Sequence, residues 1–238
     1  MQRAKSTTAF KQPHSWQQLK HGERYCQALS AFFTPWAHKR RALSHVFLGN
    51  LSGELLPPDG QNLNLQLSAN PEHFTHNSAR VLVKADLNHL PLVETSVDNC
   101  WLANTLNFCQ DPHQVLREVN RVLCDDGYLF LSLFNPCSTL VCKRQFHDVS
   151  ARNRTLPFRQ FILYRVIDWL DLLGFEIIDS ASLGRLSLLS GNHLRAIVAR
   201  KTRLSPTLNT EKVRFRQPLL QPSTALTSRP SASSQPSQ

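Results

Sequence analysis

The chain has 238 residues and a formal net charge of +10, so it can hold one α/β domain with a sizeable core. No run of about 18 apolar residues exists, and no apolar stretch follows Arg3 and Lys5, so we expect neither a membrane-spanning helix nor a secretory signal. The six cysteines form no Cys-x-x-Cys pair, and His73 and His76 alone do not make a metal site. We therefore expect no metal and a cytoplasmic location.

The N-terminal part divides into a polar stretch and a helical one. Residues 1–15 are polar, and we expect them to be flexible. Residues 16–39 place large apolar side chains at helical spacing, which predicts a helix that Pro35 bends or ends. The segment 16–44 is expected to be the helical beginning of a single domain that covers residues 16–202.

The middle of the chain alternates short strands with a well-delimited helix. Asp111 followed by Pro112 is typical of a helix start, because the carboxylate caps free N–H groups and proline needs none at the first position. We expect this helix to end at Asp125-Asp126-Gly127, with Gly127 at positive φ. The predicted strands of this region are 45–48, 62–67, 81–85, 97–103 and 128–134, and the last is too apolar to face water on either side.

The C-terminal part predicts one more helix, two strands and a tail. Residues 159–173 form an amphipathic pattern that Gly174 ends, and strands are expected at 175–179 and 196–200. Residues 203–238 are basic and rich in proline, serine and threonine, which predicts a disordered tail. Helices that alternate with buried strands predict an α/β fold with a mostly parallel sheet.

Two overlapping stretches carry a family resemblance. Residues 104–136, NTLNFCQDPHQVLREVNRVLCDDGYLFLSLFNP, resemble the second half of a class I S-adenosylmethionine-dependent methyltransferase domain of the type 11 group, and residues 81–106, VLVKADLNHLPLVETSVDNCWLANTL, fit the pattern that precedes it. The resemblance implies a Rossmann-like, seven-stranded, mostly parallel sheet with flanking helices, whose last strand is antiparallel and pairs with the strand before it. It also implies S-adenosyl-L-methionine as the cofactor.

The resemblance assigns the cofactor contacts to three turns. Asp86, followed by Leu87, takes the position that contacts the adenine edge. Gly49 and Gly53 match the glycine-rich turn after the first strand, whereas Phe47 stands at its acidic position and Leu51 at its middle glycine. No acid stands at the end of the second strand, where a carboxylate holds the ribose hydroxyls in this family. The substitutes open there are Gln66, Ser68, Asn70 and Glu72.

A second group of candidates follows from position in the sheet. Asn104 and Thr105 come after the fourth strand, at the carboxyl edge where open α/β sheets bind ligands, so we expect them to contact cofactor or substrate. Asn135-Pro136 faces the same edge. The catalytic residues stay unassigned, although three histidines could act as a general base if the acceptor must lose a proton: His89, His113 and His147.

Three functional hypotheses follow. The first is a methyltransferase that acts on a small-molecule acceptor. The second is a methyltransferase-like binding protein without catalysis, because the turn from Gly49 to Gly53 departs from the family pattern. The third is an RNA-associated methyltransferase or binding protein, which rests only on the net charge of +10 and the basic tail and which we do not favour.

Overall fold

A computed structural model of the chain describes residues 12–19, 21–39, 42–55, 62–69, 80–136, 147–148, 154–155, 158–183 and 193–202. The predicted flexible start covers residues 1–15, of which residues 1–11 lie outside the described residues, as does the predicted tail over residues 203–238. Residues 12–15 are described, and the Ser15 hydroxyl accepts a hydrogen bond from the Gln17 N–H at 3.1 Å. None of the described helices is long and apolar enough to cross a membrane.

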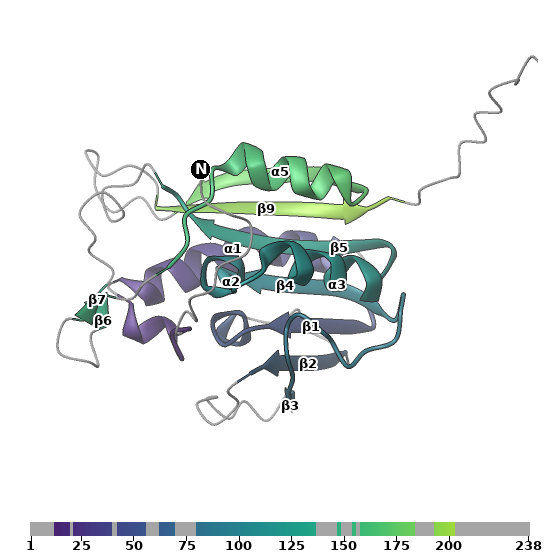
Figure 1. Cartoon of the computed structure of the whole chain (residues 1–238), viewed down its shortest axis with the longest axis horizontal. Helices are drawn as coiled ribbons and strands as arrows, with labels where there is room; N and C mark the ends of the chain where they lie inside the picture. The colour runs from purple at the N-terminus through teal and green to yellow at the C-terminus, as the bar shows by residue number, and fades with distance from the viewer. Residues whose placement is uncertain are drawn as a thin grey trace, which may run out of the picture. The chain divides into compact units, whose positions relative to one another are not determined.

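The core of the fold is a seven-stranded sheet with the order β3-β2-β1-β4-β5-β9-β8 (Figure 1). Neighbouring strands from β3 to β5 are parallel, whereas β9 runs antiparallel to both β5 and β8. This confirms the predicted fold class, with its antiparallel last strand. The strands are β1 Ser44–Leu48, β2 Leu63–Ser68, β3 Val81–Lys84, β4 Val97–Ala103, β5 Leu123–Phe134, β8 Phe175–Leu183 and β9 Leu194–Lys201, and β6 His147–Asp148 pairs with β7 Arg154–Thr155 in a separate antiparallel ladder.

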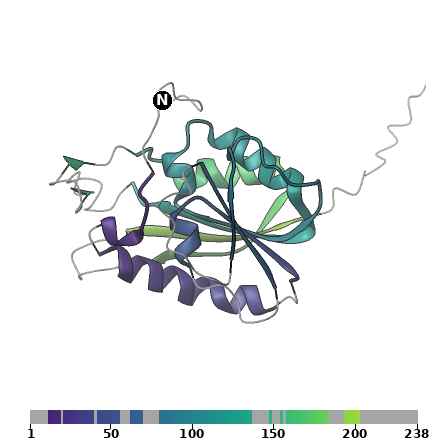
Figure 2. The same cartoon turned by 90° about the horizontal axis from the view of Figure 1, so that it is seen from below.

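Helices cover the sheet on both faces (Figure 2). On one face lie the short 3-10 helix η1, Trp16–Gln18, and α1, Gly22–Lys39, over a core of mostly aromatic side chains. On the other face lie α3, Pro112–Val122, and α5, Leu163–Leu172, over a core of aliphatic side chains. Two further short elements follow strands β1 and β4: η2, Leu51–Glu54, and α2, Thr105–Phe108.

An aromatic stack fills the α1 face. Trp101 of β4 lies between Phe47 of β1 and Phe130 of β5, with ring centroids 5.3 Å and 4.2 Å apart. Phe33 of α1 meets Trp101 and Phe130 with its ring edge. All four side chains are fully buried, and each contributes about 1.5–3 kcal/mol of transfer free energy. The side chain of Phe47 is therefore part of the core on the α1 face.

The predicted boundaries of α3 are confirmed at its start and corrected at its end. The Asp111 carboxylate accepts a hydrogen bond from the Gln114 N–H at 3.1 Å, as a helix cap does. The positive φ of the following turn is at Asp126 (60°) and not at Gly127. A side chain at Gly127 would instead lie 2.8 Å from the Cys124 carbonyl oxygen, so glycine is needed there for close packing. Strand β5 also begins earlier than predicted, at Leu123.

The first predicted helix is divided. Residues 16–18 form a 3-10 turn, His21 takes a left-handed conformation with φ 62°, and α1 then begins at Gly22. Pro35 lies inside α1, which continues to Lys39, so it does not end the helix. Gly174 does end α5, with φ 79°, as predicted.

Candidate functional site

The predicted site residues follow strands whose ends meet at one edge of the sheet. Backbone hydrogen bonds tie each strand end to its neighbour: Gly49 N–H to Leu67, Ala85 N–H to Ser68, Asn104 N–H to Ser132 and Asn135 N–H to His193. The turns after β1, β3, β4 and β5 are thereby brought side by side. This is the edge at which open α/β sheets bind ligands.

Gly49 makes the sharp turn at the end of β1. Its φ is +85°, and an added Cβ would lie 3.1 Å from the Thr105 Oγ1 atom, so both conformation and space require glycine. Thr105 donates a hydrogen bond from Oγ1 to the Leu48 carbonyl oxygen at 2.6 Å. The predicted residues Gly49 and Thr105 are thus in contact, and the hydroxyl of Thr105 holds the turn.

Gly53 lies against the side chain of Gln66. A Cβ at Gly53 would come within 1.8 Å of the Gln66 amide nitrogen, so this glycine gives room to a buried side chain of β2. Between the two glycines, Ser52 donates from Oγ to the Leu48 carbonyl oxygen at 2.6 Å and accepts from the Ala103 N–H at 2.8 Å. The turn is therefore fastened to both β1 and β4.

The segment before α1 packs over this turn. The Trp16 indole N–H donates to the Leu51 carbonyl oxygen at 2.9 Å, and the Asn50 amide donates to the Pro13 carbonyl oxygen at 3.4 Å. Glu54, which the sequence reasoning missed, accepts from the Trp16 backbone N–H at 3.2 Å. Burial raises the pKa of the Glu54 carboxyl. Leu51 is buried in this contact, which gives a packing reason for leucine at the middle glycine position.

The end of β2 offers neutral hydrogen-bonding groups. The Ser68 hydroxyl donates to the Asn50 side-chain oxygen at 2.6 Å, and both residues are buried. Gln66, another proposed substitute for the ribose acid, is the residue packed on Gly53. The remaining two, Asn70 and Glu72, lie outside the described residues. Among the described residues, the Asn50–Ser68 pair is therefore the neutral hydrogen-bonded group at the end of β2.

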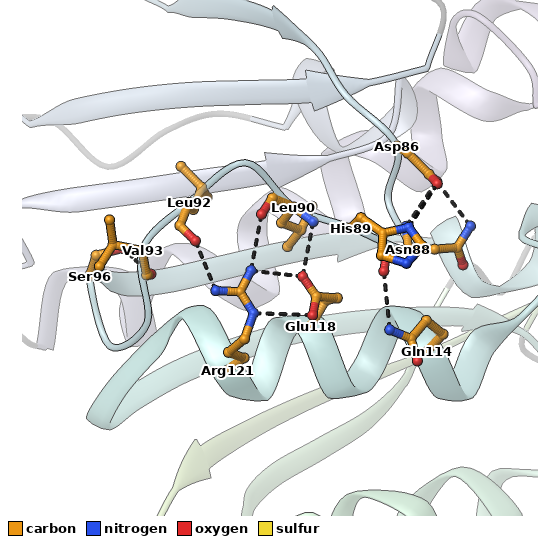
Figure 3. A network of polar contacts seen from close by, with 10 residues as sticks. All are labelled: Asp86, Asn88, His89, Leu90, Leu92, Val93, Ser96, Gln114, Glu118 and Arg121. Atoms are coloured by element: carbon orange, nitrogen blue, oxygen red, sulfur yellow. Dashed lines mark hydrogen bonds and ion pairs between the residues drawn. The ribbon is translucent and has the colours of Figure 1, made fainter.

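Asp86 forms a preorganised carboxylate after β3 (Figure 3). Its oxygens accept from the Asn88 N–H at 3.0 Å, the Asn88 amide at 2.9 Å and the His89 ring at 3.2 Å. The backbone N–H of Asn88 is the main reason why the pKa of Asp86 is lowered. The carboxylate is 58% exposed, so an ionised acceptor faces solvent here. Leu87, by contrast, packs its side chain into the aliphatic core.

The loop that carries Asp86 is clamped to α3, which the sequence reasoning missed (Figure 3). Arg121 donates to the Leu90 and Leu92 carbonyl oxygens at 3.0 Å and 2.9 Å and pairs with Glu118 at 2.8 Å. Glu118 accepts in turn from the Leu90 N–H at 3.0 Å. Helical i, i+3 spacing of an acid and an arginine was the available signal, but it does not identify the backbone groups that they bind.

Asn104 has a left-handed conformation at the end of β4, with φ 55° and ψ 13°. Its side-chain oxygen accepts from the Ser132 hydroxyl at 2.6 Å, while its amide nitrogen, fully buried, has no hydrogen-bond partner. An unsatisfied buried donor costs about 1–3 kcal/mol. Of the two residues predicted after β4, Thr105 serves the fold, and Asn104 keeps an unused donor.

The three histidines proposed as bases do not converge. His89 is 79% exposed and bonded to Asp86, whereas His113 packs on Trp169 with ring centroids 4.0 Å apart. Burial lowers the pKa of His113. The side chain of His147 lies outside the described residues. In the part of the chain that the structure describes, no group of three or more His, Cys, Asp or Glu residues could hold a metal ion.

A buried tyrosine–histidine pair lies at the same edge and was also missed. The Tyr25 hydroxyl of α1 is 2.7 Å from Nδ1 of His193, and His193 accepts the Asn135 N–H through its carbonyl oxygen. Burial raises the pKa of Tyr25 and lowers the pKa of His193, so both are neutral at pH 7. Residues 168 positions apart cannot be paired from a single sequence.

The strand order, the antiparallel β8–β9 hairpin and the polar turns after β1, β3 and β4 define a class I methyltransferase domain. Residues 40–131 match the family model of this methyltransferase domain, type 11. Over 217 residues the chain is 36% identical to the uncharacterized protein YafS of Escherichia coli K12, covering 84% of this chain and 85% of that protein. The chain belongs to the type 11 family of S-adenosylmethionine-dependent methyltransferases.

Other similarities are partial or concern the fold alone. A malonyl-[acyl-carrier protein] O-methyltransferase of Dechloromonas aromatica is 34% identical over 76 residues, covering 32% of this chain and 29% of that protein. The structure of a possible histamine N-methyltransferase of Thermotoga maritima superposes with a TM-score of 0.56 at 17% identity, covering 76% and 88% of the two chains. A chain of the Haloferax volcanii complex between the Trm112 activator and a methyltransferase reaches 0.60 at 14% identity, covering 76% and 91%.

Proposed function

We propose that this protein is a methyltransferase that transfers the methyl group of S-adenosylmethionine to a small-molecule acceptor in the cytoplasm. The observation that carries the proposal is the Asp86 turn, because its carboxylate is ionised, oriented by three donors and open to solvent at the position after β3. A free carboxylate held in this way can accept hydrogen bonds from an amino group such as that of adenine.

At the adenine end of the cofactor, the residues present match the family pattern. At the ribose and methionine ends, other groups would take the place of those that the family uses. Asp86 would hold the adenine amino group, and the Asn50–Ser68 pair would meet the ribose. The methionine end would lie at the backbone turn of Gly49, where Thr105 lies too close for a side chain on residue 49. Neutral partners hold a hydroxyl less strongly than a carboxylate does, so we expect moderate cofactor affinity.

When bound, the cofactor supplies an electrophilic methyl group on a sulfonium, and the protein has to orient and desolvate the reacting groups. Here β1 and β4 fix the turn at Gly49 through Thr105 and Ser52. The η1 segment packs over this turn, where the Trp16 indole N–H donates to the Leu51 carbonyl oxygen. The neutral Tyr25–His193 pair lies at the end of β5, where the His193 carbonyl oxygen accepts the Asn135 N–H.

The direct test is calorimetric titration of the full chain with S-adenosylhomocysteine, the expected product. We expect binding that weakens about 10-fold or more in Asp86→Ala, because a charge-assisted hydrogen bond is lost. Asp125→Ala, an exposed carboxylate at the turn before the main part of β5, is the matched control and should leave affinity unchanged. No binding by the unmodified protein would contradict the proposal.

The second candidate is a binding protein of this family without catalysis. The specific observation in its favour is that Phe47 belongs to the aromatic core, so β1 supplies no carboxylate to the edge. Ser68→Asp restores an acid at the end of β2 without touching that core. If the unmodified protein does not bind S-adenosylhomocysteine but Ser68→Asp does, lost cofactor binding is the better account.

RNA association stays a third hypothesis, which rests on the net charge of +10. Its test is salt-dependent RNA binding that decreases when residues 203–238 are removed.

A further inference from the structure

The amide group of Asn104 is fixed in one orientation. Its backbone N–H donates to both the carbonyl oxygen and the hydroxyl of Ser132, each at 3.1 Å. Because the Ser132 hydroxyl accepts there, its own proton goes to the Asn104 side-chain oxygen, 2.6 Å away. The oxygen of the amide is thereby occupied, and the NH₂ group is the part of the side chain left to bind something else.

None of the described residues provides that partner, since the Asn104 amide nitrogen is buried and has no hydrogen bond. Such groups are rare, because buried donors normally find a partner in the protein or in water. Asn107, three residues further on and equally buried, shows the ordinary pattern. It donates to the Arg159 carbonyl oxygen at 2.6 Å and accepts from the Phe134 N–H at 3.2 Å. Of these two neighbouring asparagines, only Asn104 has a side-chain nitrogen without a partner.

The order of the strands indicates which ligand the donor faces. Under the proposed function, the cofactor runs along the edge from Asp86 after β3, past β2, to the Gly49 turn after β1. The next strand in the sheet is β4, so Asn104 lies one strand beyond the methionine end, with Ser132 of β5 behind it. Under the proposed function, the molecule that meets the edge at this point would be the methyl acceptor rather than the cofactor.

We propose that the amide nitrogen of Asn104 donates a hydrogen bond to a carbonyl or carboxylate oxygen of the methyl acceptor; this inference rests on the proposed function. An N–H donor requires a lone pair on the ligand, which both oxygen types supply. The contact fixes the acceptor beside the methionine end of the cofactor, as alignment of the two reacting atoms requires. Asn104 is thus the acceptor-binding residue of the site.

The test follows the side-chain NH₂ resonances of ¹⁵N-labelled protein saturated with S-adenosylhomocysteine. Acetate is the carboxylate probe and acetamide is the carbonyl probe. The Asn104 signal is assigned by its loss in Asn104→Gly. Glycine adopts the positive φ of this position without strain, and it lacks the side-chain donor. We expect a saturable shift of the Asn104 signal with at least one probe, whereas the Asn107 signal stays in place.

The outcomes separate the inference from the function on which it rests. A shift with acetate only identifies a carboxylate acceptor, and a shift with acetamide only identifies a neutral carbonyl. If S-adenosylhomocysteine binds by calorimetry and neither probe moves the Asn104 signal, the inference is wrong while the proposed function stands. If S-adenosylhomocysteine itself moves the signal and the probes do not, Asn104 belongs to the cofactor site. If S-adenosylhomocysteine does not bind at all, the proposed function fails first.

Discussion

The clamp between α3 and the loop after β3 permits a quantitative prediction. Arg121→Ala removes the guanidinium that binds the Leu90 and Leu92 carbonyl oxygens and leaves the Glu118 carboxylate without its ion pair (Figure 3). The Arg121 side chain is 30% exposed and Glu118 is 14% exposed, so water replaces only part of what is lost.

The expected loss of stability follows from these contacts. A hydrogen bond from a charged group to a carbonyl oxygen contributes about 1.5–3 kcal/mol to stability. We take the lower value, about 1.5 kcal/mol, because the Arg121 side chain is partly exposed. A surface ion pair contributes about 1 kcal/mol or less. Two such hydrogen bonds and the lost ion pair together give a destabilisation of about 3–4 kcal/mol. For a small domain in urea this lowers the midpoint of unfolding by roughly 1–2 M.

Urea unfolding followed by circular dichroism is the assay, and Arg117→Ala is the matched control. Arg117 lies on the same helix but is exposed, so we expect its loss to change stability by less than about 0.5 kcal/mol. Arg121→Lys keeps the charge but not the planar fork and should fall between the two. Because the loop carries Asp86, Arg121→Ala should also weaken S-adenosylhomocysteine binding. Equal midpoints for Arg121→Ala and Arg117→Ala would refute the reasoning.

Three further predictions concern single sites. Burial lowers the pKa of His45 from 6.5 to about 4. Between those pH values only the unfolded chain takes up this proton, so the free energy of unfolding falls on acidification by up to about 1.4 kcal/mol per pH unit. Urea titrations at several pH values should show a smaller dependence of this free energy on pH for His45→Gln. Tyr25→Phe leaves the His193 ring without its phenol partner and should cost about 1–3 kcal/mol in the same assay. Gly127→Ala brings a methyl group 2.8 Å from the Cys124 carbonyl oxygen, so a thermal melt should show a lower unfolding midpoint. The decrease should be larger than that of Ala103→Gly in β4, which also changes one methyl group. An equal decrease would mean that the backbone shifts to make room.

The sequence predicted the fold well because the signals that define it are local. The Asp111 cap, the apolar face of α3 and the buried strand up to Phe134 are each set by neighbouring residues, and the structure has all three. The errors are local too. Positive φ was assigned to Gly127 because glycine tolerates it most easily, but the neighbouring Asp126 takes it, since aspartate also tolerates this region and Gly127 is needed for close packing.

The site was less predictable, because its contacts join distant segments. Nothing in the sequence near Thr105 indicates that its hydroxyl binds the Leu48 carbonyl oxygen, and nothing near Tyr25 points to His193. Sequence position placed Asn104 and Thr105 at the correct edge. Only the hydrogen bonds show that one side chain supports the turn and the other keeps a free donor.

The two departures from the family pattern in the first turn have one physical cause. Phe47 and Leu51 both belong to the aromatic core on the α1 face, where Phe47 stacks on Trp101 and Leu51 packs under Trp16. Phe47→Asp would therefore bury a carboxylate in place of an aromatic ring and destabilise the fold by about 3–5 kcal/mol, rather than restore a cofactor contact. Under the proposed function, cofactor affinity would then depend on groups outside β1, first of all on Asp86. Substitutions at Asp86 therefore test the function without disturbing the core.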